Sequence, residues 1–412
     1  MRLLHTSDWH LGHTLHDVPR DFEHEAFLGW LLETIGEQRV DALLVAGDIF
    51  DTANPSARAQ AQYYRFLTEA RRRYPALQVV VIGGNHDSAD RLDAPTPLLD
   101  QLGIHVVGGL PRKADRQLDL DRLLVPLRGA DGEVQAWVAA VPFLRPADLP
   151  PIPDTEDPLV EGVRAVYREV FEGARRRRTP GQAILGMGHL YMTGTALSEL
   201  SERRILGGNQ HALPHDLFPE DVAYVALGHL HRPQAVGRSE VRYSGSPIPL
   251  SLAEIDYPHQ VCLVELEGEE LRSVEALRVP RSVEMLRIPR SGALGKAEAL
   301  EALGKLPSAA GKDPERRPFL ELRISLERPD PALRHEVERA LEGKYARLVR
   351  LKVELGGDGR ALADRVAKKM LDEIAPEVVF KNRWRQSYEG EPPPELLEAF
   401  RALVAEVQEE AK

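Results

Sequence analysis

Five apolar runs in this 412-residue chain end in the same way: each is followed, usually after a glycine, by a residue able to bind a metal ion. Each run has the length and composition of a buried strand. In open α/β sheets, ligands bind outside the carboxyl ends of the strands, so five such ends can converge on one place. The pattern therefore predicts a metal site at one edge of a sheet. The five segments are residues 6–10, 45–48, 82–87, 187–189 and 227–231.

The candidate ligands at these strand ends carry carboxylate, imidazole and amide groups but no thiolate. Such a mixture suits manganese, iron or zinc better than a soft metal. Several of them come in pairs two positions apart, and in extended backbone such pairs project the same way. The candidates are Asp8, His10, Asp48, Asn85, His189, His229 and His231.

Seven ligands are too many for one ion. Two ions about 4 Å apart, bridged by a carboxylate, would use the whole set and would hold the attacking and leaving oxygens of a phosphodiester. Asp48 follows the strand that looks most buried, residues 42–46, so we expect it to be the bridge. The expected chemistry is metal-dependent hydrolysis of a phosphate ester.

The chain is long enough for two or three domains. Up to residue 278, short apolar runs alternate with amphipathic stretches, which predicts an α/β fold with central mixed sheets. Strands are expected at residues 2–6, 42–46, 78–82, 123–127, 136–141, 183–187 and 224–227, with a hairpin at 260–274. Helices are expected at residues 25–36 and 57–73.

A small α+β domain is expected at residues 279–356, because strands and helices alternate there in the order βαβαβ. The strands are residues 283–288, 319–326 and 346–355, and the helices are 297–303 and 331–341. Glycines at 356–359 indicate a flexible linker, and only helices follow in a third region, residues 357–412. The last helix has an apolar face that a partner or a neighbouring helix must cover. That face consists of Leu396, Leu397, Phe400, Leu403, Val404 and Val407.

Composition narrows the functional classes. The single cysteine, Cys262, excludes an internal disulfide and a thiolate metal site. Neither a secretory leader nor an apolar run of roughly 20 residues is present, so we expect a cytoplasmic protein without membrane association. The net charge of −11 argues against the strongly basic surface of a stand-alone nucleic-acid binder, so any grip on DNA must be local, metal-assisted or shared.

In sequence letters, the five strand ends resemble those of the SbcD family of nucleases, which lies within the calcineurin-like metallophosphoesterases. The motifs are D-W-H-L-G at 8–12, G-D-I-F-D at 47–51, G-N-H-D at 84–87, G-H at 188–189 and G-H-L-H at 228–231. The resemblance extends to Y-S-G-S-P at 243–247 and to the tail around residues 379–380 and 390–392. Each motif alone is weak, whereas the five in this order are specific.

The resemblance implies two metal ions, with manganese as the metal and an activated water as the nucleophile. One ion would be held by Asp8, His10, Asp48 and His231. The other would be held by Asp48, Asn85, His189 and His229. It also implies that His86 does not bind metal but meets the scissile phosphate and assists the leaving oxygen.

Asp51 departs from part of the family, because archaeal and eukaryotic relatives tend to have a histidine there. Bacterial members and many phosphatases carry an acid. Our hypothesis is that the Asp51 carboxylate accepts a hydrogen bond from His86 and thereby sets its tautomer, as carboxylates near metal sites do.

The function implied by the resemblance is a DNA nuclease, both a double-strand exonuclease and a single-strand or hairpin endonuclease. It would act in DNA break and hairpin processing with a coiled-coil ATPase, SbcC, gripped by residues 357–412, and it would form a homodimer and a heterotetramer. Residues 279–356 would be its DNA-capping domain. The alternatives are a stand-alone phosphatase or cyclic-nucleotide phosphodiesterase, since a fold does not choose a substrate, and an adaptor whose metal site has decayed. Thr52 counts against Ser/Thr phosphatases, and the complete ligand set counts against the adaptor.

Other polar residues receive structural interpretations. Asp87 is expected to cap a loop, Trp9 to pack, and His5 to lie in the core. The arginine runs at 71–73 and 175–178 are interpreted as solvated helix faces. The remaining histidines lack a strand-end position, and most are expected at the surface or at caps: His13, His16, His24, His105, His211, His215, His259 and His335.

Overall fold

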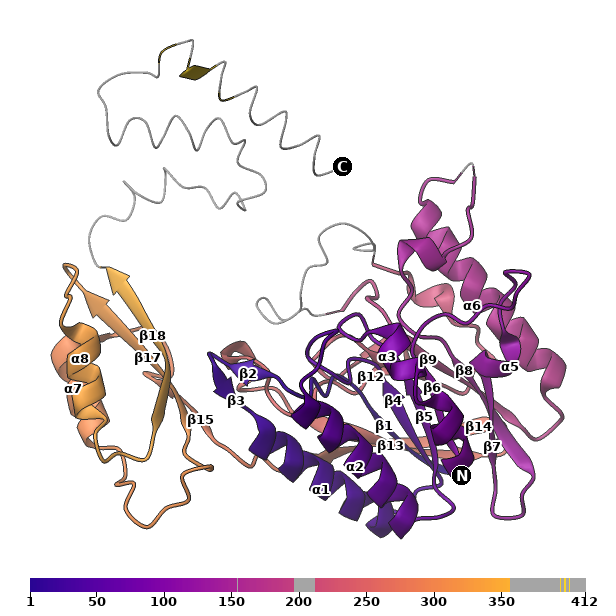
Figure 1. Ribbon diagram of the computed structural model, residues 1–412, viewed down its shortest axis with the longest axis horizontal. Coiled ribbons are helices and arrows are strands. Elements are labelled where there is room, and N and C mark those ends of the chain that lie inside the picture. The colour runs from indigo at the N-terminus through magenta and orange to yellow at the C-terminus, as the bar shows by residue number, and fades with distance from the viewer. Residues whose placement is uncertain (154, 196–211, 356–392, 394–395, 398–399, 401–412) are drawn as a thin grey trace.

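The computed structural model describes residues 1–153, 155–195 and 212–355, together with Pro393, Leu396, Leu397 and Phe400 (Figure 1). The expected glycine linker and nearly all of the expected C-terminal helices therefore lie outside the described residues. None of the helices within the described ranges is long and apolar enough to cross a membrane.

The first sheet has six strands in the order β14-β13-β1-β4-β5-β6. From β1 to β6 neighbouring strands are parallel, and β13 pairs antiparallel with β1. Its strands are β1 (Arg2–Thr6), β4 (Ala42–Ala46), β5 (Gln78–Ile82), β6 (Ile104–Val107), β13 (Gln260–Glu267) and β14 (Glu270–Arg278). The carboxyl ends of β1, β4 and β5 therefore meet at one edge.

The second sheet also has six strands, in the order β11-β12-β10-β9-β8-β7. Strands β8, β9, β10 and β12 run parallel, and β9 and β10 end side by side because His189 pairs with Gly228. Its strands are β7 (Leu124–Arg128), β8 (Val134–Ala140), β9 (Ala183–His189), β10 (Tyr224–Gly228), β11 (Gln234–Val236) and β12 (Arg238–Tyr243).

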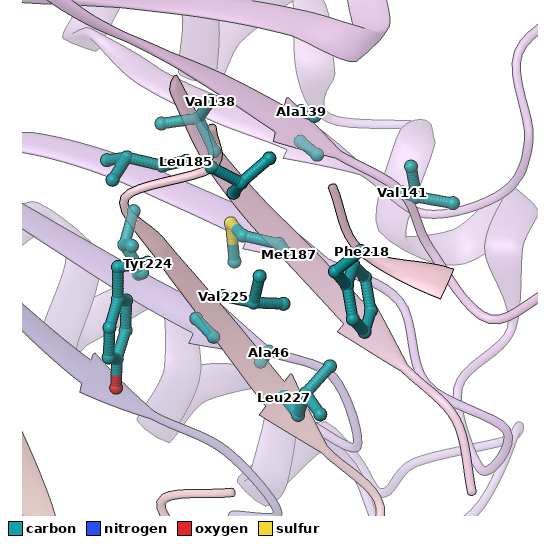
Figure 2. Close-up of a cluster of buried hydrophobic side chains, with 14 of the residues drawn as sticks. Ala46, Val138, Ala139, Val141, Leu185, Met187, Phe218, Tyr224, Val225 and Leu227 are labelled. Carbon is teal, nitrogen blue, oxygen red and sulfur yellow. The ribbon is translucent and has the colours of Figure 1, made fainter. Parts of the chain in front are cut away.

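The two sheets pack against each other. Alternate residues of the first sheet, such as Leu44 and Ala46, share one core with Met187 and Leu227 of the second (Figure 2). The intervening residues, such as Val45, pack in another core with helices α1 (Asp21–Glu37) and α2 (Ala57–Arg73). Helix α6 (Pro158–Arg177) contributes buried residues to the core of the second sheet. Burial on both faces explains why these strands are near-continuous apolar runs.

A third sheet forms a small α+β unit, residues 285–355, with a core of its own (Figure 1). Its elements are β15 (Met285–Ile288), β16 (Leu294–Gly295), α7 (Lys296–Gly304), β17 (Phe319–Leu326), α8 (Leu333–Ala340) and β18 (Arg347–Leu355). The unit contacts the sandwich through a mixed cluster that includes Leu15, Leu252, Met285 and Phe319. The Arg20 guanidinium lies over the Phe319 ring, 5.2 Å from its centroid.

Several elements were not expected from the sequence. Helix α6 is one, and β6 and β12 are others, because β6 has only four residues and β12 alternates with polar ones. Strand β9 continues through His189, so this candidate ligand lies in the strand itself. The remaining short elements are β2 (Thr14–Leu15), β3 (Val18–Pro19), α3 (Ala89–Asp93), α4 (Thr96–Leu99) and α5 (Leu120–Leu123).

Candidate metal centre

The ends of β1, β4, β5, β9 and β10 converge, and the structure brings all seven candidate ligands together. Backbone hydrogen bonds join the first two ends, since the Asp8 amide donates to Gly47 O at 3.0 Å and the His10 amide to Asp48 O at 3.0 Å. The His229 amide donates to Asp8 Oδ1 at 2.9 Å. Three groups have ligand atoms within 4.8 Å of one another: Asp8 with His10 and His231, His10 with Asp48 and His86, and Asp8 with Asp48 and His189.

Asp48 lies at the centre of this cluster. Its Oδ2 is 3.5 Å from His10 Nε2 and 3.4 Å from His189 Nε2, while its Oδ1 accepts a hydrogen bond from the His86 amide at 2.9 Å. Burial raises the pKa of the Asp48 carboxyl, but the neighbouring histidines, His189 foremost, outweigh burial and hold it well below its usual range. A buried, ionised carboxylate between two imidazoles has the position expected of a bridging ligand.

The backbone at the site is strained. Asp8, His10, Asp48 and His229 have φ values of 55°, 48°, 50° and 102°, in a region that non-glycine residues rarely adopt. Such a conformation costs about 1–3 kcal/mol per residue and persists only where surrounding contacts hold it. The hydrogen bonds between the strand ends supply those contacts, and strain gathered at four candidate ligands supports a functional role.

Two glycines before candidate ligands allow close approach between strands. A Cβ on Gly47, whose φ is +87°, would lie 2.3 Å from His189 Nδ1. A Cβ on Gly228 would lie 1.8 Å from Ala46 O. Side chains at these positions would push β4 away from β9 and β10 and separate the candidate ligands.

His10 and His231 each have a carboxylate behind the ring. His10 Nδ1 is 3.3 Å from Asp51 Oδ1, and His231 Nδ1 is 3.0 Å from Glu254 Oε1. Burial lowers the pKa of His10, although Asp51 opposes the shift. The other nitrogen, His10 Nε2, is buried and has no hydrogen-bond partner among the described residues. A cation would satisfy this atom, so the donor set fits a metal ion.

His189 and His229 converge instead on an amide. His189 Nε2 lies 2.9 Å and His229 Nδ1 3.0 Å from Asn85 Oδ1. The other nitrogen of the first ring, His189 Nδ1, donates to the main-chain oxygen of Ala46 at 2.9 Å. Burial lowers the pKa of both rings; for His229 it falls to about 3, whereas the Asp48 carboxylate raises that of His189 to about 9.

His86 is half-buried beside Asp48, and its ring packs edge-on to His10 with centroids 4.7 Å apart. Its Nδ1 donates to the main-chain oxygen of Asp51 at 2.8 Å. The expectation that the Asp51 carboxylate accepts this bond is therefore wrong. The carboxylate faces His10 and His13, whose hydrogen bonds hold the pKa of Asp51 well below its usual range although burial raises it.

The structure reveals two site residues that the sequence did not. Glu254 is fully buried against His231. His13, expected at the surface, places Nδ1 3.0 Å from Asp51 Oδ1 and Nε2 2.9 Å from Leu250 O. Neither residue follows an apolar run, so only the tertiary fold brings them to the site.

Three structural interpretations are confirmed. Asp87 caps the loops, because its carboxylate accepts hydrogen bonds from the amides of Ile49, Phe50 and Gly84. Trp9 packs in the core beneath the site, and buried His5 bonds Tyr224 Oη at 2.9 Å. By contrast, two further histidines expected at the surface or at caps, His24 and His259, are buried.

Comparison with known families places both parts of the chain. Residues 1–233 match the family described as calcineurin-like phosphoesterase. Residues 281–388 match the family described as type 5 capsule protein repressor C-terminal domain.

Individual relatives are all named as the SbcD component of the nuclease SbcCD. The protein from Rhodobacter capsulatus is 42% identical over 393 residues, which cover 92% of this chain and 93% of the relative. The Escherichia coli K12 protein is 37% identical over 68% of both chains. The Bacillus subtilis protein is 37% identical over 67% of this chain and 69% of its own. With these matches and the convergent strand ends, the chain belongs to the SbcD family of calcineurin-like phosphoesterases.

Proposed function

We propose that this protein is a metal-dependent nuclease that hydrolyses DNA phosphodiesters with two divalent ions, manganese foremost. The observation that carries the proposal is the position of Asp48, whose carboxylate lies between histidines of two ligand groups. The relatives named as components of the nuclease SbcCD support DNA as the substrate.

The donor set divides into two groups of four that share Asp48. One ion would be held by Asp8, His10, Asp48 and His231. The second would be held by Asp48, Asn85, His189 and His229. Oxygen and imidazole donors without thiolate suit manganese. When bound, the two ions would activate water and offset the charge that develops on the phosphate.

His86 would act on the substrate rather than on metal. The Asp51 main-chain oxygen can only accept a hydrogen bond, so this contact places a proton on His86 Nδ1 and leaves Nε2 for the substrate. In its protonated form, Nε2 can donate to the leaving oxygen of the scissile phosphodiester. Asp51 would act mainly through its carboxylate on His10 and through its carbonyl on His86.

The rest of the chain would deliver DNA and a partner. The small α+β unit would correspond to the DNA-capping domain, with boundaries at residues 279–356, after a phosphoesterase domain at 1–278. Residues 357–412 would bind a coiled-coil ATPase of the SbcC type, and the assembly would contain a homodimer of this chain. The relatives' names support the ATPase partner, since each is a component of an SbcCD nuclease.

The test compares substrates. The purified full chain, with and without its ATPase partner, is incubated with Mn²⁺ and either a labelled DNA duplex or a p-nitrophenyl phosphate ester. We expect the duplex to be cut, EDTA to stop the reaction, and Asp48→Asn to abolish it. Asp221→Asn, which removes only a surface ion pair with Arg175, is the matched control and retains activity. Cleavage of the small ester alone, or no cleavage under any condition, contradicts the proposal.

A further inference from the structure

A short helical turn, η4 (Leu252–Glu254), holds the carboxylate behind His231. Glu254 is fully buried, and its two oxygens have different partners. Oε1 is 3.0 Å from His231 Nδ1, and Oε2 accepts a hydrogen bond from the Leu250 amide at 2.8 Å. The orientation of the His231 ring therefore depends on the position of η4.

Two arginines beyond the end of β14 bind the backbone on either side of Glu254. Arg287 Nη2 donates to Leu252 O at 2.6 Å, and Arg281 Nη2 donates to Ile255 O at 2.7 Å. Arg287 lies in β15 of the small α+β unit. These bonds join η4 to the part of the chain that leads into and forms that unit.

Apolar packing reinforces the same connection. Leu252 is buried in one cluster with Val283, Met285 and Phe319, and Ile255 packs against that cluster. The turn that carries Glu254 is thus held by the small unit through both side-chain packing and charged hydrogen bonds.

Arg287 is itself held in place by the small unit. Its Nε is 2.6 Å from Oε2 of Glu321, a residue of β17 that is 1% exposed. Arg323 Nη2 contacts the same oxygen at 3.1 Å, but no hydrogen bond joins it to η4 among the described contacts. The two arginines therefore share a partner and differ in their reach toward the metal centre.

We infer that the small α+β unit sets the orientation of His231, and with it the strength of the ion site that contains His231, through Arg287, η4 and Glu254. Arg287 and Arg281 are positioning residues in this scheme, because neither touches the metal centre. The inference rests on the proposed function, since it assumes that His231 is a ligand. It adds that the site is complete only while the small unit is docked.

The test is a Mn²⁺ titration of the full chain, with free Mn²⁺ followed by electron paramagnetic resonance. Removing a hydrogen-bond partner of a ligand typically costs roughly 10- to 100-fold in metal affinity. Arg287 acts one step further away, so we expect Arg287→Ala to weaken one of two Mn²⁺ sites by roughly 3- to 10-fold, below that range. Arg323→Ala, the matched control, leaves both sites unchanged, and Arg287→Lys restores part of the affinity. The midpoint of thermal unfolding without metal is measured for each variant.

A double-mutant cycle tests the route. If Arg287 acts through Glu254, its replacement has no further effect on Mn²⁺ affinity in the Glu254→Gln background. Equal affinities for Arg287→Ala and Arg323→Ala, or an undiminished Arg287 effect in that background, overturn the inference. If Arg287→Ala does not fold, Arg281→Ala replaces it with the same expected results. A wild-type chain that binds no Mn²⁺ contradicts the proposed function itself, which separates the two failures.

Discussion

The two sides of the candidate metal centre are built differently. On one side, His10 and His231 each face a carboxylate, Asp51 or Glu254. On the other, His189 faces a main-chain carbonyl of β4, and His229 shares the Asn85 amide with it. A carboxylate orients an imidazole and makes it a stronger metal ligand, whereas a carbonyl orients it without adding charge. The His10/His231 side can therefore be adjusted through single side chains, and the His189/His229 side is built into the sheet.

The largest expected effect comes from Asp48, which belongs to both sides. Asp48→Asn removes the charge shared by both proposed ions, so we expect DNA cleavage to fall on the order of 10³-fold and both Mn²⁺ sites to weaken. Cleavage rates and Mn²⁺ titrations measure this. Asp93→Asn is the control, because Asp93 bonds Gly108 and Arg122 instead of the centre. Loss of only one ion would show that Asp48 does not bridge the two sides.

Glu254→Gln is expected to affect one side only. It keeps the shape of the side chain but removes the negative charge facing His231, so the Mn²⁺ site that contains His231 should weaken roughly 10- to 100-fold. The site that contains His189 should keep its affinity. Equal weakening of both sites would remove the distinction between the two sides.

Asp51→Asn should have a smaller effect on the same side. The Asp51 side chain is 28% exposed and its carboxylate is shared between His10 and His13, so we expect up to about tenfold weaker binding of one ion. The hydrogen bond from His86 goes to the Asp51 main chain, so the mutation leaves that contact available. A pH-rate profile that keeps its shape while the Mn²⁺ requirement rises would agree, and a profile shifted through His86 would contradict this.

Much of the metal centre could be predicted because it follows strand ends. Strands β1, β4 and β5 and helix α2 begin and end at the expected residues, since buried parallel strands are continuous apolar runs and Ser56 caps α2. The seven candidate ligands followed from the same pattern.

The supporting residues could not be predicted in this way. Glu254 and His13 lie in segments without strand periodicity, and they reach the centre only after the two sheets pack. Which oxygen of Asp51 meets His86 depends on the path of the loop after β4, where Asp87 binds two successive amides. A pattern of residue types carries no information about that path.

The most direct test of the two-ion centre is the anomalous scattering of manganese from crystals of this protein soaked in Mn²⁺. We predict two peaks about 4 Å apart, with the Asp48 carboxylate between them, His10 and His231 at one and His189 and His229 at the other. A single peak, or two peaks of which only one contacts Asp48, would contradict the account.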